Sequence, residues 1–64
     1  MCQTSAMMER EGGYELLLEN VTELEVMSDG LKMSTLFEGS TSLPGVAIRR
    51  IDFSAGKVYL YRPK

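Results

Sequence analysis

Hydrophobic and polar residues alternate in short runs along this chain, and glycine-containing turn sequences separate the runs. The runs cover residues 4–9, 14–18, 24–27, 31–37, 46–52 and 57–61. Alternation of this kind is typical of strands with one buried face, and short strands between frequent turns are typical of an all-β sandwich or barrel. The pattern therefore predicts an all-β fold.

Two of these runs predict which side chains point into the core. Successive side chains of a strand point to opposite faces of the sheet. We therefore expect Leu31, Met33 and Thr35 to point inward from one strand, and Val58 and Leu60 from another.

Two dipeptides predict the geometry of individual turns. Asp29-Gly30 lies between two strand-like runs and indicates a β-hairpin with a primed turn, because these residues tolerate the positive φ that such a turn needs. Pro44-Gly45 suits the two central positions of a type II turn.

Residues 15–27 fit a second pattern as well. They can be drawn as an amphipathic helix with an apolar stripe opposite its glutamates. The centre of that helix, Asn20-Val21-Thr22, has low helix propensity and two β-branched residues. Leu24-Glu25-Val26 alternates and runs directly into the predicted hairpin turn. We favour two strands with a bend at residues 19–22.

Length and cysteine content limit how this chain can be stabilised. With 64 residues it forms one domain, residues 1–64, and such a chain buries only about 60% of its unfolded surface. Domains of this size often use disulfides, a metal or a partner subunit, and a single cysteine cannot form an internal disulfide. We therefore expect an oligomer in a reducing, cytoplasmic compartment. The first ten residues lack the features of a signal peptide, and no run approaches the ~20 apolar residues of a membrane span, so we expect no membrane association.

The charged residues argue against two classes of function. Seven basic and nine acidic residues give a net charge of −2, which disfavours nonspecific nucleic-acid binding. Arg49-Arg50 and residues 62–64 could form a local basic patch, although solvated surface is the simpler interpretation. The chain contains no histidine, and so it lacks the commonest metal ligand and the commonest general base. We therefore expect no enzyme and no Ser-His-Asp or Cys-His catalytic site.

The single cysteine, Cys2, is the candidate metal ligand. A cell usually removes the first methionine when the next residue is small, and Cys2 would then carry a thiol and a free α-amine. Sulfur and nitrogen of one residue can close a five-membered chelate ring on a metal ion. If Met1 is retained, the sulfur and the backbone amide nitrogen of Cys2 are the remaining chelating pair.

The aromatic residues have two interpretations. Tyr14, Phe37, Phe53, Tyr59 and Tyr61 could stack on bases, as in an oligonucleotide-binding barrel. We expect instead that Phe37 and Phe53 are buried and that Tyr59 and Tyr61 cover a sheet face or a dimer interface.

Methionines and glutamates likewise have structural interpretations that we prefer. Met27 and Met33 lie in strand patterns and are expected to fill the core rather than to form a thioether copper site. A solvated face is the preferred interpretation of the acidic residues Glu15, Glu19, Glu23 and Glu25.

Several segments in order along the chain resemble the CooT family of small nickel-binding proteins. The segments are Met1-Cys2, Glu19-Asn20-Val21-Thr22-Glu23-Leu24-Glu25-Val26, Asp29-Gly30, Leu36-Phe37-Glu38-Gly39, Leu43-Pro44-Gly45-Val46-Ala47-Ile48 and Ile51-Asp52. Each segment alone is weakly specific, but their combination with an N-terminal cysteine is more so, and the resemblance covers nearly the whole chain.

The resemblance implies a homodimer of small Sm-like or SH3-like β-barrels, each a single domain of residues 1–64. It implies one Ni(II) ion held between the chains by Cys2 of each, and a role as a nickel carrier or metallochaperone in carbon monoxide dehydrogenase maturation or related nickel handling. Two thiolates and two nitrogens can lie in one plane, which favours Ni(II) or Cu(II). The alternative is an Sm-like adaptor or RNA-binding module in which Cys2 is incidental, and a gel-shift assay at physiological salt would discriminate between the two.

Overall fold

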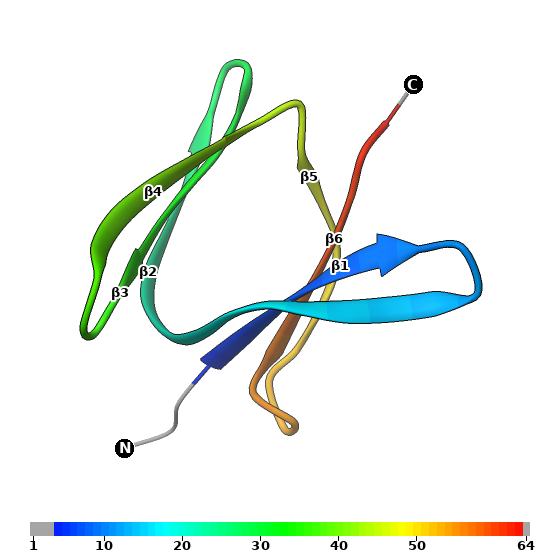
Figure 1. The fold of residues 1–64 in the computed structure, drawn as a ribbon, viewed down its shortest axis with the longest axis horizontal. Coiled ribbons are helices and arrows are strands. Elements are labelled where there is room, and N and C mark those ends of the chain that lie inside the picture. Colours follow the sequence, from blue (N-terminus) through cyan, green and yellow to red (C-terminus); the bar gives the residue numbers. More distant parts are fainter. Residues whose placement is uncertain (1–3, 64) are drawn as a thin grey trace.

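A six-stranded sheet makes up the structure, a computed structural model that describes residues 4–63. The strands are β1 (Thr4–Arg10), β2 (Gly13–Met27), β3 (Gly30–Thr35), β4 (Gly39–Pro44), β5 (Ala47–Asp52) and β6 (Lys57–Tyr61). Their order across the sheet is β4-β3-β2-β1-β6-β5, and every pair is antiparallel except β1 with β6 (Figure 1). The all-β prediction is confirmed. The part of the chain that the structure describes contains no helix long and apolar enough to cross a membrane.

Strand β2 is long and bends in the middle, so that it pairs with two different neighbours. Residues 13–21 pair with β1 and residues 21–27 pair with β3. At the bend Asn20 has a φ of 58°, a left-handed conformation that asparagine adopts more readily than most residues. The Asn20 carbonyl accepts a hydrogen bond of 2.9 Å from the Leu36 amide. The predicted bend at residues 19–22 is confirmed, although a single strand replaces the two that we expected.

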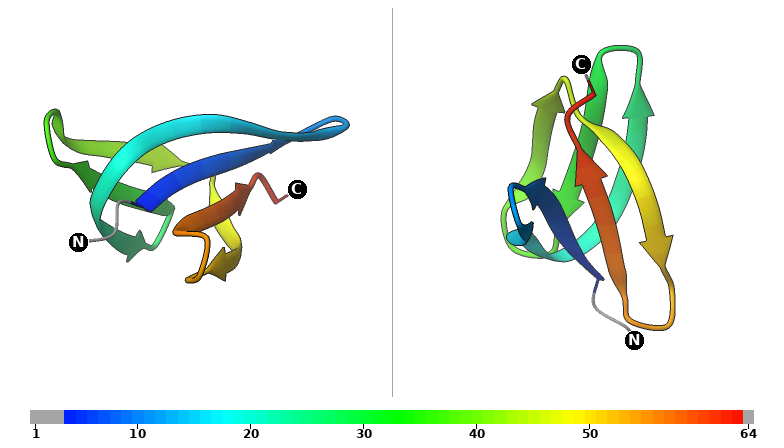
Figure 2. Two further views of the ribbon diagram at one scale, coloured as in Figure 1. Left: turned by 90° about the horizontal axis from the view of Figure 1, so that it is seen from below. Right: turned by 90° about the vertical axis from the view of Figure 1, so that its right-hand side faces the viewer.

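The bend folds the sheet so that its two halves face each other, and the core lies between them (Figures 1 and 2). Strands β1 and β6 contribute one side of this core and β3 contributes the other. The buried hydrophobic side chains are Ala6, Met8, Leu31, Met33, Val46, Val58 and Leu60. Thr35 is also buried, so the inward positions predicted for β3 and β6 are confirmed.

The sheet does not close into a barrel, and this part of our prediction was wrong. β4 and β5 are consecutive in sequence but lie at opposite ends of the strand order. Gly45, with a φ of 71°, turns the chain between them, and its amide donates a 2.8 Å hydrogen bond to the Asp29 carbonyl. This bond fixes the turn beside the β2–β3 hairpin, and from there β5 runs along β6 instead of pairing with β4 (Figure 1). The positive φ of Gly45 agrees with the predicted type II turn.

The predicted β2–β3 hairpin is present, but the structure needs glycine at position 30 for a different reason from the one we predicted. Met27 pairs with Gly30, which leaves Ser28 and Asp29 as the loop. Ser28, Asp29 and Gly30 all lack the positive φ of a primed turn, so that prediction was wrong. A Cβ atom on Gly30 would instead collide with the Leu43 carbonyl oxygen and lie 2.8 Å from the Pro44 Cα. Glycine is required because β4 passes so close.

Candidate functional site

The predicted metal ligand, Cys2, lies outside the described residues. It precedes Thr4, the first residue of β1, by two positions in the sequence. Two residues of extended chain reach about 7 Å at most, so the surface around Thr4 is the relevant one for a metal held by this cysteine. We call this end of the molecule the N-terminal rim. It comprises Thr4, the β3–β4 turn (residues 36–38) and the β5–β6 turn (residues 53–56).

Hydrogen bonds hold the beginning of β1 firmly in the rim. The Ser5 amide donates to the Gly56 carbonyl at 2.9 Å, which ties β1 to the β5–β6 turn. On the other side Thr4 pairs with Val21, and Val21 in turn pairs with Thr35, the last residue of β3. Seen from below, the start of β1 lies between the β3–β4 and β5–β6 turns (Figure 2, left).

Both phenylalanines of the chain lie in the rim, and both are exposed. The exposed fraction is 79% for Phe37 in the β3–β4 turn and 86% for Phe53 in the β5–β6 turn. The prediction that these residues are buried was wrong. Each follows the last residues of a strand, where the chain has left the sheet and no other strand or turn within residues 4–63 covers the ring.

Two hollows open beside these turns. One, of about 400 Å³, lies between β2 and the β5–β6 hairpin, and its walls include Thr4, Val21, Leu24 and Phe53. The other, of about 300 Å³, lies between β2 and the β3–β4 turn and is bordered by Phe37. The rim therefore combines exposed aromatic rings with concave, partly apolar surface.

Asp52 fixes the conformation of the turn that carries Phe53. Its Oδ1 accepts hydrogen bonds from the Ser54 hydroxyl at 2.7 Å and from the Ala55 amide at 3.0 Å. The bond from Ser54, followed by that from Ala55, lowers the pKa of the Asp52 carboxyl below its ordinary value of 3.8. The ionised carboxylate is thus the form that holds this turn.

Replacing Asp52 by alanine should loosen the β5–β6 turn and lower the thermal unfolding midpoint at neutral pH. Because the pKa of Asp52 is lower in the folded state, the ionised carboxylate stabilises the fold, and this stabilisation is fully present above the unfolded-state pKa. It disappears as the pH falls through the folded-state pKa. Unfolding curves of wild type and Asp52→Ala should therefore differ at pH 7, and the difference should shrink as acidification protonates the carboxyl. A midpoint difference that persists unchanged at pH 2 would contradict this role.

No group of three acidic or cysteine side chains within residues 4–63 is placed to hold a metal ion. The four glutamates of β2 are exposed, as expected of a solvated face: Glu15, Glu19, Glu23 and Glu25. Met33 is fully buried, as predicted, whereas the prediction that Met27 fills the core was wrong because Met27 is 43% exposed.

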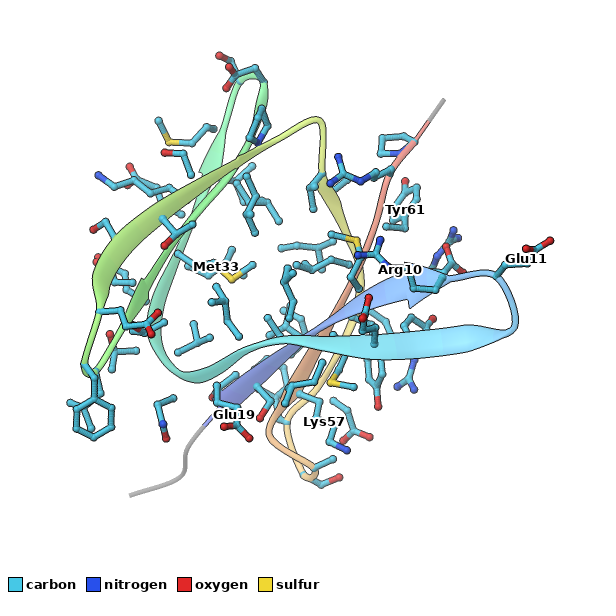
Figure 3. The ribbon with its side chains drawn as sticks, viewed as in Figure 1. Arg10, Glu11, Glu19, Met33, Lys57 and Tyr61 are labelled. Atoms are coloured by element: carbon cyan, nitrogen blue, oxygen red, sulfur yellow. The ribbon has the colours of Figure 1, made fainter. Side chains whose placement is uncertain are left out.

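Strand β6 carries Tyr59 and Tyr61 on its outer face, and arginines of β5 cover both rings. The guanidinium of Arg49 lies 4.0 Å from the ring centroid of Tyr61, and that of Arg50 lies 4.0 Å from that of Tyr59 (Tyr61 is labelled in Figure 3). Arg49 also forms a 3.0 Å ion pair with Glu9. The prediction that these tyrosines cover a sheet face is confirmed, and a base could stack on these ring faces only by displacing the arginines.

Comparison with known proteins finds matches that cover nearly the whole chain. A family model described as "CO dehydrogenase accessory protein CooT" matches residues 1–61. An uncharacterized protein of Methanothermobacter thermautotrophicus is 32% identical over 60 residues, which cover 94% of this chain and 88% of that protein. A crystal structure described as CooT from Carboxydothermus hydrogenoformans is similar with a TM-score of 0.83 at 25% identity, over 98% of this chain and 100% of that chain.

Proposed function

Since this chain belongs to the CooT family of CO dehydrogenase accessory proteins, we propose that it binds one Ni(II) ion per homodimer through Cys2 of each chain. The observation that carries the proposal is the family match, which begins at residue 1 and so includes the cysteine. The ion is cargo, to be passed to an enzyme that needs nickel, and no catalytic step is assigned to the chain.

The donor chemistry of Cys2 supports nickel as that cargo. A thiolate is a soft ligand, and the amine or amide nitrogen of the same residue completes a chelate ring. One such pair from each chain gives two sulfurs and two nitrogens, a set that can lie in a plane and that favours Ni(II) or Cu(II). A two-fold axis between identical chains explains how a protein with one cysteine supplies two sulfurs.

The small number of candidate ligands supports a carrier rather than a storage site. The single cysteine and the absence of histidine match a protein that holds one ion at a time. We place this function in the cytoplasm, with an enzyme-maturation protein or the nickel enzyme itself as recipient.

Native mass spectrometry of the protein mixed with Ni(II) tests this proposal. We expect one nickel ion per two chains, together with a mass that reports whether Met1 is present. Met27→Leu is a suitable control, because it removes an exposed thioether and should leave the stoichiometry unchanged. Nickel retained by single chains, or no nickel retained at all, would refute the proposed site.

A further inference from the structure

We propose that one outer face of the sheet docks a different protein, one that presents carboxylates beside apolar side chains. The face belongs to the half of the sheet formed by the first part of β2 (residues 13–21), β1, β6 and β5. We call it the tyrosine–arginine face and define it by Met7, Tyr14, Leu16, Arg49, Arg50 and Tyr59. The proposal goes beyond the nickel function and uses none of its ligands.

The strand register places these side chains side by side across four strands. Leu16 of β2 lies opposite Met7 of β1, and Met7 lies opposite Tyr59 of β6. Tyr59 in turn lies opposite Arg50 of β5. This row points away from the core, because the residues before and after Met7 and Tyr59 in their strands are all buried. Tyr14 adjoins the row, with its ring centroid 4.7 Å from that of Tyr59.

A β-bulge in β5 keeps both arginines on this face. A register shift before Arg50, which pairs with Tyr59, leaves Arg49 as an extra residue. In a regular strand successive side chains alternate between faces, so one of the two arginines would point inward. Here both guanidiniums lie 4.0 Å from ring centroids of outward-pointing tyrosines, Arg49 over Tyr61 and Arg50 over Tyr59. Bulges commonly re-aim a side chain beside a functional surface.

The outer face of the other half of the sheet provides an internal comparison. Its outward side chains are Glu23, Glu25, Lys32, Ser34, Ser40 and Ser42. A polar face of this kind is typical of a sheet with one side in solvent. Tyrosine, methionine and arginine are instead enriched in protein interfaces, where lysine, glutamate and serine are depleted. One half of the sheet thus has a solvated outer face, and the other half has the composition of a docking surface.

The two arginines determine the chemistry of the partner. A guanidinium carries five N–H donors in a planar fork that matches a carboxylate. One nitrogen of Arg49 donates a 3.0 Å hydrogen bond to Glu9, and Arg50 lies 3.9 Å from Asp52, beyond hydrogen-bonding distance. The side chains of Arg49 and Arg50 are 46% and 55% exposed, so further N–H groups can meet carboxylates of a partner. Contact with the tyrosine rings holds the guanidiniums in place, which lowers the entropy lost on binding.

Two other occupants fit this face less well. An RNA would meet Glu9 beside Arg49 and a chain of net charge −2, and its bases could not stack on rings that the arginines cover. A second copy that used the same face would bring two more arginines. The carboxylates it would bring, Glu9 and Asp52, already lie against its own arginines.

Nuclear magnetic resonance of isotope-labelled protein, titrated with a peptide of alternating glutamate and leucine, tests the proposal. We expect amide shifts to concentrate in β1, β5, β6 and the first part of β2. Arg50→Gln and Leu16→Ser should each weaken peptide binding about tenfold. The matched controls are Lys32→Gln and Val26→Ser, which remove one positive charge and one exposed apolar side chain from the other half of the sheet. Both controls should bind the peptide as wild type does.

Four results would overturn the proposal. They are an absence of shifts on this face, binding by Arg50→Gln equal to that of wild type, displacement of the peptide by an RNA oligonucleotide, and weaker self-association of Arg50→Gln in sedimentation equilibrium. The last two would identify RNA or a second copy as the occupant. The spectra of all variants should otherwise match wild type, because none of the four side chains belongs to the core. Arg50→Gln should keep its nickel stoichiometry, so this proposal and the metal site can fail separately.

Discussion

Replacing Cys2 by serine should abolish stoichiometric Ni(II) binding. Serine has nearly the shape of cysteine, but its hydroxyl does not ionise near neutral pH and it is a hard ligand. Both chains of the proposed homodimer would carry the substitution, so the proposed site would lose both sulfurs at once. Loss of groups that merely orient ligands costs about 10- to 100-fold in metal affinity, and loss of the ligands themselves should exceed about 100-fold. Titration calorimetry measures the affinity, and thiolate-to-nickel charge-transfer absorption reports the bond itself.

The matched control for Cys2→Ser is Met7→Leu. Met7 lies in β1 and is half-buried, and leucine keeps its apolar character while it removes the thioether nearest in sequence to the cysteine among the described residues. This variant should bind nickel as wild type does. If Cys2→Ser retains both the affinity and the charge-transfer band, the thiolate is not the ligand and the proposed carrier function is wrong.

Gly30→Ala should destabilise the protein more than alanine at any other glycine for which the surroundings of an added Cβ are known. The added Cβ meets the Leu43 carbonyl and the Pro44 Cα, which are backbone atoms and cannot rotate away. To relieve this collision β4 must move away from β3, which breaks backbone hydrogen bonds between the two strands. We expect a loss of about 3 kcal/mol in the free energy of unfolding, a large share of what so small a core supplies. Urea unfolding at a fixed protein concentration measures it.

Gly12→Ala provides the comparison for that experiment. Gly12 has a φ of 87° and open space where a Cβ would lie, so alanine there costs only the strain of a left-handed backbone, about 1 kcal/mol. The two variants thus separate steric collision from backbone strain. Equal losses at both positions would show that the close approach of β4 to Gly30 does not limit the fold.

Local patterns predicted the strands well where one face is buried and the other is not. Leu31, Met33 and Thr35 in β3, and Val58 and Leu60 in β6, point inward as alternation required. The choice against a helix for residues 15–27 depended on the β-branched pair beside Asn20, and Asn20 is where β2 bends. In each case the residues that determine the strand or the bend lie within a few positions of one another, so a short stretch of sequence is enough to predict it.

Features that depend on distant segments were not predictable in this way. Hydrophobicity alone placed Phe37 and Phe53 in the core, although a turn residue is covered only if some other segment happens to pass over it. Barrel closure likewise depends on whether β4 and β5 meet, and the Gly45 turn between them is hydrogen-bonded to Asp29, a residue in a different part of the sequence. Gly30 was recognised as a turn residue, but its contact with Leu43 follows from the β3–β4 register.

The candidate site was only partly accessible from sequence. Cys2 was identified by its residue type and its position, and the family assignment that supports it is confirmed by the match over residues 1–61. The surface around it was not predicted, because the β3–β4 and β5–β6 turns are far from residue 4 in sequence. Only the pairing of β1 with β2 and β6 shows that they share one end of the molecule.

The parallel pairing of β1 with β6 also determines when this protein can finish folding. Ser5 needs Lys57 as its neighbour, and the ribosome adds Lys57 about fifty residues after Ser5. Contacts between such distant segments slow folding, and the first strand waits without its second partner until most of the chain has been synthesised. A fragment that ends before β6 should therefore leave one edge of β1 without its hydrogen-bond partners, and the fold is completed only once β6 is available.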